Sequence, residues 1–232
     1  MRIAILAAVI LGMTGCAKVN YTEIEPGTFS GEVAVVWLKG TDGPGDGTFV
    51  YVPTPGNPLT FTRPDKTTVI EPTMIYTDGG SVPPLARAFN GLTPWNYAPA
   101  YIVHDWLFRA KQCWESGTRP KDYKVVASMD FPTSATIIAE SIKALHDSGR
   151  VRRNDTSGAL ITAAVASPIS ERLWAKTDTC TEVSDRDRDL ALRAVGRRAL
   201  VGRSYGLRVY RDEAGDLQRD DAAVVVGVTS FD

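Results

Sequence analysis

The spacing of apolar residues changes near Pro84, and this change limits the folds that the chain can adopt. Before Pro84, short runs rich in β-branched and aromatic residues are separated by clusters of Gly, Pro and Asp, which is typical of strands joined by turns. These runs span residues 32–38, 48–52, 59–62 and 68–70. After Pro84, apolar residues recur three and four positions apart, as on helices. We therefore predict an α+β fold, with a small N-terminal antiparallel sheet followed by a helical, bundle-like half.

The helical half divides at recognisable capping residues. Asp130 or Pro132 suits the first turn of one helix, and serine followed by proline at 167–168 suits a fresh helix start. We expect helices at 97–110, from about 130 to 148, from 158 with a break at 167–168, and at 185–198. The segments 207–210 and 222–228 are predicted to form a closing hairpin around 213–216.

The N-terminus has the order of an export signal. Arg2 precedes an apolar run at 3–11, which is shorter than the roughly 20 residues that span a bilayer. The small residues before Cys16 resemble the lipobox of bacterial lipoproteins, which implies cleavage before Cys16 and acylation of that cysteine. We expect a signal peptide at 1–15, a lipid-anchored tether at 16–30, one α+β domain at 31–175, and a C-terminal extension at 176–232. The alternative is an ordinary N-terminal helix with an incidental cysteine.

The expected location is the cell envelope, on the periplasmic side of the outer membrane. Ala17 stands where an aspartate would resemble an inner-membrane retention signal. Removing residues 1–15 takes away one basic side chain and changes the net charge from −1 to −2. This balance offers no electrostatic footprint for nucleic acid. The expected partners are the membrane, through the lipid anchor, and an envelope or phage protein.

Two cysteines remain once Cys16 is assigned to lipid. An oxidising compartment would permit a disulfide between Cys113 and Cys180, although sequence does not show whether the two residues approach each other. The chain has no CxxC and no paired Cys/His spacing, which argues against a structural zinc site.

Two clusters carry residues suited to chemistry. The first, at 77–83, places Asp78 and Ser81 beside two glycines whose backbone amides can approach a ligand closely. The second, at 103–108, places His104 and Asp105 on the helix face opposite the apolar stripe. A histidine on a rigid element can act as a base, and a carboxylate is a ligand for hard cations.

The pair TDGGSVP and IVHDWLF resembles an uncharacterised family of bacterial and tailed-phage proteins, a domain of unknown function numbered 1353. Its pattern is an extended segment, T-D-x-x-S-[IV]-P, a helical H-D-x-L-[YF], and a third helix. The resemblance covers roughly residues 68–145. The chain departs from the pattern at Pro84, where a basic residue is common, and at Phe108, where tyrosine is usual. The resemblance implies where the site lies and leaves its activity open.

The helical motif is also similar to the catalytic helix of secreted phospholipase A2 enzymes. That resemblance implies His104 as general base and Asp105 as calcium ligand, with Asp78 and its neighbouring glycines completing the cation shell. The phospholipase pattern needs a second carboxylate to orient the histidine. In this chain that place falls on Ala135, and Glu140 is expected on the polar side of its helix. The disulfides that flank the phospholipase helix are absent from the sequence.

Two functions follow as alternatives. The first is a non-catalytic binding or structural module, in which His104 hydrogen-bonds the 77–83 turn and Asp78 caps a helix. The second is a calcium-dependent hydrolase of esters or phosphoesters, with His104 as base, Asp78 and Asp105 as calcium ligands, and Ser81 assisting. His146 stands at a helix end, where histidine commonly complements the helix dipole, and we assign it no chemistry.

Two other hydrolase classes fit the sequence less well. Gly79-Gly80-Ser81 lacks the G-x-S-x-G elbow of serine hydrolases. The chain has two histidines in all, which are too few for the two-metal site of an HD-type phosphohydrolase.

Overall fold

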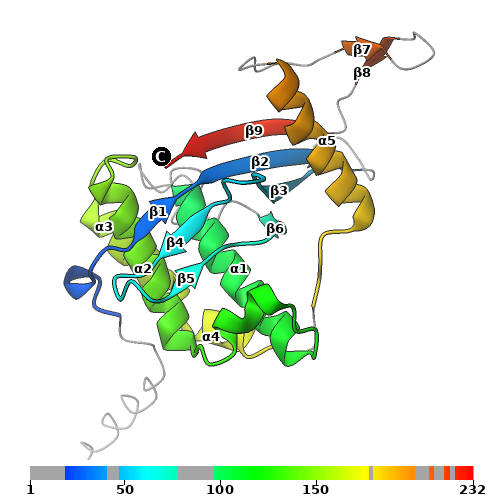
Figure 1. Ribbon diagram of the computed structural model, residues 1–232. Coiled ribbons are helices and arrows are strands. Elements are labelled where there is room, and N and C mark those ends of the chain that lie inside the picture. The colour runs from blue at the N-terminus through cyan, green and yellow to red at the C-terminus, as the bar shows by residue number, and fades with distance from the viewer. Residues whose placement is uncertain are drawn as a thin grey trace, which may run out of the picture.

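A four-stranded antiparallel sheet, with strand order β6-β3-β2-β9, forms the centre of the fold (Figure 1). The computed structural model describes residues 19–40, 47–77, 97–177, 180–201, 209–211, 217–219 and 223–231. The central strands are β2 (Glu32–Lys39), β3 (Gly47–Pro53), β6 (Ile75–Thr77) and β9 (Ala223–Ser230). A second sheet, in the order β1-β4-β5, contains β1 (Thr28–Ser30), β4 (Thr60–Thr62) and β5 (Val69–Ile70). The predicted α+β class and the four predicted strand regions are confirmed.

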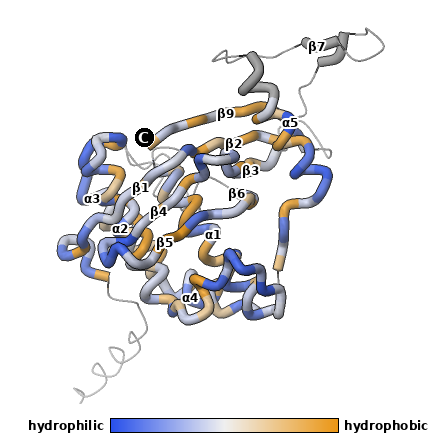
Figure 2. The backbone as a smooth tube through the Cα atoms, viewed as in Figure 1, coloured by the Kyte–Doolittle hydropathy of each residue, from blue (hydrophilic) through white to orange (hydrophobic). Residues whose placement is uncertain are grey.

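The central sheet is covered on both faces, because successive side chains of a strand point to opposite sides. Val33 and Val35 of β2 pack into the main core with α1 (Ala98–Glu115) and α2 (Phe131–Asp147). Val36 and Leu38 of the same strand pack into a second core with α5 (Asp185–Val201). Apolar stretches lie along β2 and β9 between these layers (Figure 2). The arrangement is therefore helix, sheet, helices.

Two helices begin where their capping residues predict, whereas α3 (Asp155–Val165) begins three residues before the expected start at 158. Asp130 caps α2 by accepting a hydrogen bond from the Thr133 amide at 2.9 Å. Ser167 caps α4 (Pro168–Trp174), which follows α3 after a short break. The described residues also form the 3₁₀ helices η1 (Tyr21–Glu23) and η4 (Lys121–Val126). The predicted helix break at 167–168 and the predicted start at Asp130 are confirmed. In the part of the chain that the structure describes, no helix combines the length and hydropathy that a membrane span requires.

The C-terminal strands pair differently from the prediction. β7 (Val209–Arg211) pairs with β8 (Leu217–Arg219), whereas β9 lies antiparallel to β2, with Leu38 opposite Ala223. The prediction that 207–210 would pair with 222–228 is wrong. The valine-rich strand β9 instead forms an edge of the central sheet, where it pairs with β2 and buries Ala223 in the second core. The segment from 176 onward, expected as an extension, therefore supplies α5 and β9 to the second core.

The expected tether at 16–30 also needs correction from residue 20 onward. Tyr21 is buried, and its hydroxyl lies 3.4 Å from Nδ1 of His146 on α2. A Cβ at Gly158 of α3 would collide with the Tyr21 ring, so the absence of a side chain at this position makes room for it. Phe29 of β1 packs against Phe61 with ring centroids 4.9 Å apart. These residues anchor the N-terminal segment to the domain by burying aromatic surface.

Two covalent or ionic links join distant parts of the fold. Cys113 of α1 and Cys180 form a disulfide with their Cα atoms 4.4 Å apart, the pairing that the sequence left open. Glu140, expected on the polar side of its helix, is buried and accepts two hydrogen bonds from Arg63, at 2.7 and 2.9 Å. The expectation for Glu140 is wrong because β1 and β4 pack over that side of α2. Arg63, which directly follows β4, supplies the compensating charge.

Candidate functional site

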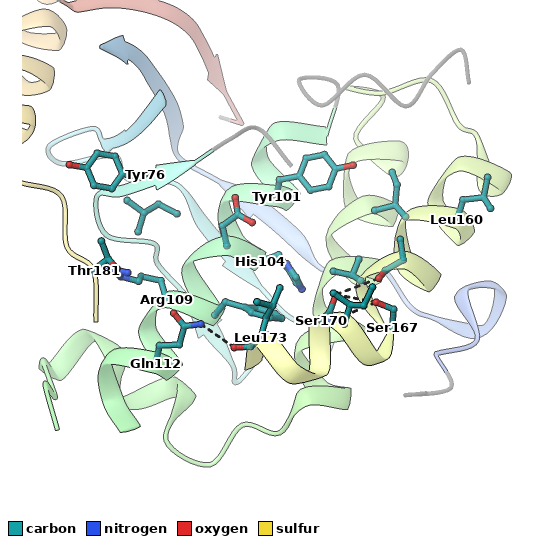
Figure 3. A pocket seen from close by; sticks show the side chains of 17 residues that line it. Tyr76, Tyr101, His104, Arg109, Gln112, Leu160, Ser167, Ser170, Leu173 and Thr181 are labelled. Atoms are coloured by element: carbon teal, nitrogen blue, oxygen red, sulfur yellow. Dashed lines mark hydrogen bonds between the residues drawn. The ribbon is translucent and has the colours of Figure 1, made fainter. Parts of the chain in front are cut away.

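A cavity of about 470 Å³ lies between α1 and the pair α3–α4 (Figure 3). This volume falls within the range of small-molecule sites, roughly 300–1,000 Å³. One wall is a face of α1, whose residues at spacings of three and four all point the same way. The opposite wall is mostly aliphatic. The lining residues are Ile75, Tyr76, Tyr101, His104, Asp105, Phe108, Arg109, Gln112, Leu160, Ile161, Ala164, Val165, Ser167, Ile169, Ser170, Leu173 and Thr181.

His104 lies on the α1 wall with only 7% of its surface exposed. Its ring packs against Phe108, with centroids 4.7 Å apart, and Phe108 in turn meets Trp174 edge-on at 5.0 Å. Nε2 of His104 is buried and makes no hydrogen bond to any residue that the structure describes. Burial lowers the pKa of His104 to about 3, so the imidazole is neutral at physiological pH.

Asp105, the neighbour of His104, is tied to the end of the central sheet. The hydroxyl of Thr77, the last residue of β6, donates a hydrogen bond to Oδ2 of Asp105 at 3.0 Å. This bond brings the residue before Asp78 against α1, on the side that carries the cavity. Asp78 and Ser81, the other predicted site residues of this cluster, lie outside the described residues, as does Cys16.

The described part of the chain contains no group of three or more His, Cys, Asp or Glu side chains that could hold a metal ion. Ala135, at the place where the phospholipase pattern needs an orienting carboxylate, is fully buried in the core. His104 therefore has no acidic side chain from α2 to hold it as an imidazolium. The described residues bring together an imidazole, one carboxylate and an apolar wall.

Arg109 and Gln112 complete the polar part of the α1 wall, and the sequence analysis did not identify them. They follow Asp105 at spacings of four and seven, so the helical period already placed them on its face. Nη2 of Arg109 is buried and makes no hydrogen bond to any described residue. Burial lowers the pKa of Arg109, although a guanidinium stays charged at neutral pH. Gln112 donates a hydrogen bond to the carbonyl of Leu173 at 3.1 Å and so joins α1 to α4.

The α3–α4 wall was also missed, because apolar residues at helical spacing usually indicate core packing. Here several of them are exposed to solvent. Among the described residues, three of the six exposed large apolar side chains line this cavity, namely Leu160, Ile169 and Leu173, with exposures of 48, 70 and 42%. Their clustering at one cavity distinguishes them from scattered surface residues, which need no special explanation.

His146, the second histidine, is held differently from what its position at a helix end suggested. Its ring lies between two tyrosines, with Tyr21 Oη 3.4 Å from Nδ1 and Tyr97 Oη 3.2 Å from Nε2. Burial lowers the pKa of His146, whereas a histidine that complements the helix dipole would be stabilised in its charged form. The helix-dipole interpretation is therefore wrong. His146 is a neutral link between η1, α1 and α2.

Acid is expected to destabilise the protein through His104. The unfolded chain binds a proton at the ordinary pKa of about 6.5, whereas the folded chain binds it only near pH 3. Stability is therefore lost as the pH falls from about 6.5 toward 3, by about 2 kcal/mol at pH 5 for this residue alone. Urea unfolding of the native protein and of His104→Gln between pH 7 and pH 5 measures the effect. The free energy of unfolding of the variant should fall less between pH 7 and pH 5 than that of the native protein. Equal losses in the two proteins would contradict the lowered pKa of His104.

Comparison with known proteins gives one match. Residues 56–130 match the family model described as "Protein of unknown function (DUF1353)". The matched segment runs from before β4 to the start of α2 and includes His104 and Asp105. It supports the family resemblance over that part of the chain. Searches of the curated proteins and of the solved structures gave no match.

Proposed function

We propose that the protein is a binding module of the bacterial cell envelope that takes a mostly apolar ligand into the cavity between α1, α3 and α4. One observation carries the proposal. An aliphatic wall faces an α1 wall on which a buried imidazole nitrogen makes no hydrogen bond to any described residue. A buried polar atom without a partner costs free energy, about 1–3 kcal/mol, and a ligand that supplies the partner recovers part of it.

The protonation state of His104 favours binding over base catalysis. A general base works best when its pKa lies near the operating pH. Burial lowers the pKa of His104 to about 3, which makes it a weak base at neutral pH. The neutral ring instead offers one hydrogen-bond donor and one acceptor, which suits it to orienting a bound group.

The envelope location is part of the proposal and rests on the sequence. The charged start, short apolar run and small residues before Cys16 support export and acylation. Several acyl chains on one cysteine would hold the domain stably at a membrane, because each buried methylene contributes about 0.8 kcal/mol. We propose the periplasmic side of the outer membrane, with ligands or protein partners drawn from the envelope or from a phage.

Occlusion of the cavity tests the binding function. The probe is N-phenyl-1-naphthylamine, an uncharged apolar dye, added to the full chain carrying Cys16→Ser so that no detergent is needed. Ala164 lines the cavity, and Ala163 beside it on α3 is exposed and does not line it. Ala164→Phe should weaken dye binding by at least about tenfold, or 1.4 kcal/mol, because the ring fills the ligand's space. Ala163→Phe, the matched control, should bind as the parent does.

Two results would count against the binding function. One is the absence of saturable dye binding to the parent chain. The other is equal binding by the two phenylalanine variants, which would place the dye elsewhere on the surface. Circular dichroism of both variants shows whether each has folded.

A calcium-dependent hydrolase is the second candidate, and the bond from Thr77 to Asp105 favours it. That bond brings the chain that leads to Asp78 against the helix that carries His104 and Asp105. In this candidate Asp105 is one ligand of a hard cation, Asp78, which lies outside the described residues, is proposed as another, and His104 faces the bound substrate. Millimolar calcium should raise the melting temperature of the parent chain and leave Asp105→Asn unchanged. This candidate would be eliminated if calcium left the melting temperature of the parent unchanged and His104→Ala hydrolysed esters at the same rate as the parent.

A further inference from the structure

We infer that the cavity takes a single-chain amphiphile with an anionic head group, with the chain against α3 and α4 and the head beside Arg109. This inference rests on the proposed binding function and names the class of ligand. The inference rests on where the charged and the aliphatic side chains lie along the cavity. Ser167 and Ser170 also line its aliphatic side, but their hydroxyls bond to each other and to the carbonyl of Ala164. Figure 3 places Arg109, Tyr76 and Thr181 on one side of it and Leu160 on the other, with His104 between them.

The head-group end is defined by an arginine with unused hydrogen-bonding capacity. Nη2 of Arg109 is buried at the cavity and makes no hydrogen bond to any described residue. No carboxylate of a described residue lies within ion-pair distance of it, and Glu182 acts only at longer range. A guanidinium pairs well with carboxylate and phosphate oxygens, and such charge-assisted bonds are stronger in a partly dry site. An anionic head group therefore pairs with Arg109, the one cationic side chain among the described residues that line the cavity.

The chain end is defined by the aliphatic residues of α3 and α4. Leu160 and Ile161 of α3 and Ile169 and Leu173 of α4 line the same wall of the cavity, opposite α1, and three of these four are exposed. Covering them would remove apolar surface from water, at about 25 cal/mol per Å². The α1 wall from Tyr101 to Gln112 is roughly 16 Å long at 1.5 Å per residue. An elongated apolar chain fits this shape better than a compact ring system.

Calorimetric titration with four ten-carbon ligands tests the inference. The ligands are decanoate, decyl phosphate, 1-decanol and decyltrimethylammonium, each below its micelle concentration, with the full chain carrying Cys16→Ser. The two anionic ligands should bind at least about tenfold more tightly than the alcohol, as expected for a hydrogen bond to a charged group. The cationic ligand should bind most weakly. A preference for decanoate would identify a fatty acid, and a preference for decyl phosphate would identify a phosphate head group.

Variants separate the head group from the chain. Arg109→Gln should reduce the preference for anionic heads to about twofold while the alcohol binds as before. Arg109→Lys should keep the preference, and so should Arg172→Gln, which removes an exposed positive charge of α4 that does not line the cavity. Leu173→Asp should lower the affinity for all four ligands. Equal affinity for the four head groups, or a preference that survives Arg109→Gln, overturns the inference but leaves apolar binding intact. Failure of all four ligands to bind overturns the proposed function itself.

Discussion

Loss of the Cys113–Cys180 disulfide is expected to lower the free energy of unfolding by about 4 kcal/mol. The two cysteines are 67 residues apart, and the enclosed loop contains α2, α3 and α4. A cross-link over a loop of this length removes conformational entropy from the unfolded chain, which corresponds to about 4 kcal/mol at 25 °C in the chain-entropy treatment. Urea unfolding of the double variant Cys113→Ala, Cys180→Ala against the oxidised parent measures the difference.

The third cysteine is removed from both proteins by Cys16→Ser, so that no other thiol can exchange. Intact-mass measurement after alkylation, with and without reductant, establishes that the parent is oxidised. Because Thr181 follows Cys180 and lines the cavity, the double variant should also bind the apolar dye less tightly. Unfolding curves that coincide for the two proteins would contradict the stabilising role of this bond.

Breaking the buried pair between Arg63 and Glu140 is expected to cost about 3 kcal/mol. The Glu140 carboxylate is 6% exposed and accepts from Nε and Nη2 of Arg63, so either single substitution leaves a poorly solvated charge behind. Removing only one partner of such a pair destabilises proteins by roughly 3–5 kcal/mol. The lower end applies here because 20% of the Arg63 side chain is still exposed. Thermal and urea unfolding of Glu140→Gln measures the loss.

Two comparisons show whether the loss comes from the unpaired charge. Arg153→Gln removes one partner of the Arg153–Asp155 pair, whose side chains are 67 and 53% exposed, and an exposed pair contributes only about 0–1 kcal/mol. The double variant Arg63→Met, Glu140→Leu leaves no charge unpaired and should be more stable than Glu140→Gln. If the loss in the double variant equalled the sum of the losses in Arg63→Met and Glu140→Leu alone, the unpaired charge would not be the cause.

The amphipathic helix α1 shows how far sequence could specify the site. The period of 3.6 residues placed His104 and Asp105 on the face opposite Trp106, and the structure has them there, lining a cavity. The same period also placed Arg109 and Gln112 on that face. Local rules sufficed because helical geometry is decided within one turn, and because Asp130 and Ser167 cap the helices by hydrogen bonds to residues three positions away.

Long-range pairing was beyond the reach of the sequence. The sequence of β9 suggests half of a local hairpin, yet the strand pairs with β2, 185–198 residues earlier in the chain. It does so because β2 offers an edge for pairing and has apolar residues on both faces. The sequence predicts Glu140 at the surface, whereas its burial depends on the hydrogen bonds from Arg63, which directly follows β4. His146 stands at a helix end, yet burial lowers its pKa, and its contacts there, Tyr21 and Tyr97, come from distant parts of the chain.

The sequence by itself determined the class of the fold, the presence of the helices with the capped starts of α2 and α4, and the residues that share the α1 face. Each of these follows from interactions among residues close together in the chain. Only the tertiary structure decided which strand completes the sheet, which charges are buried together, and that α3 and α4 close a cavity over His104. Those outcomes depend on which distant surfaces exclude water from one another, and that is set by the packing of the whole domain.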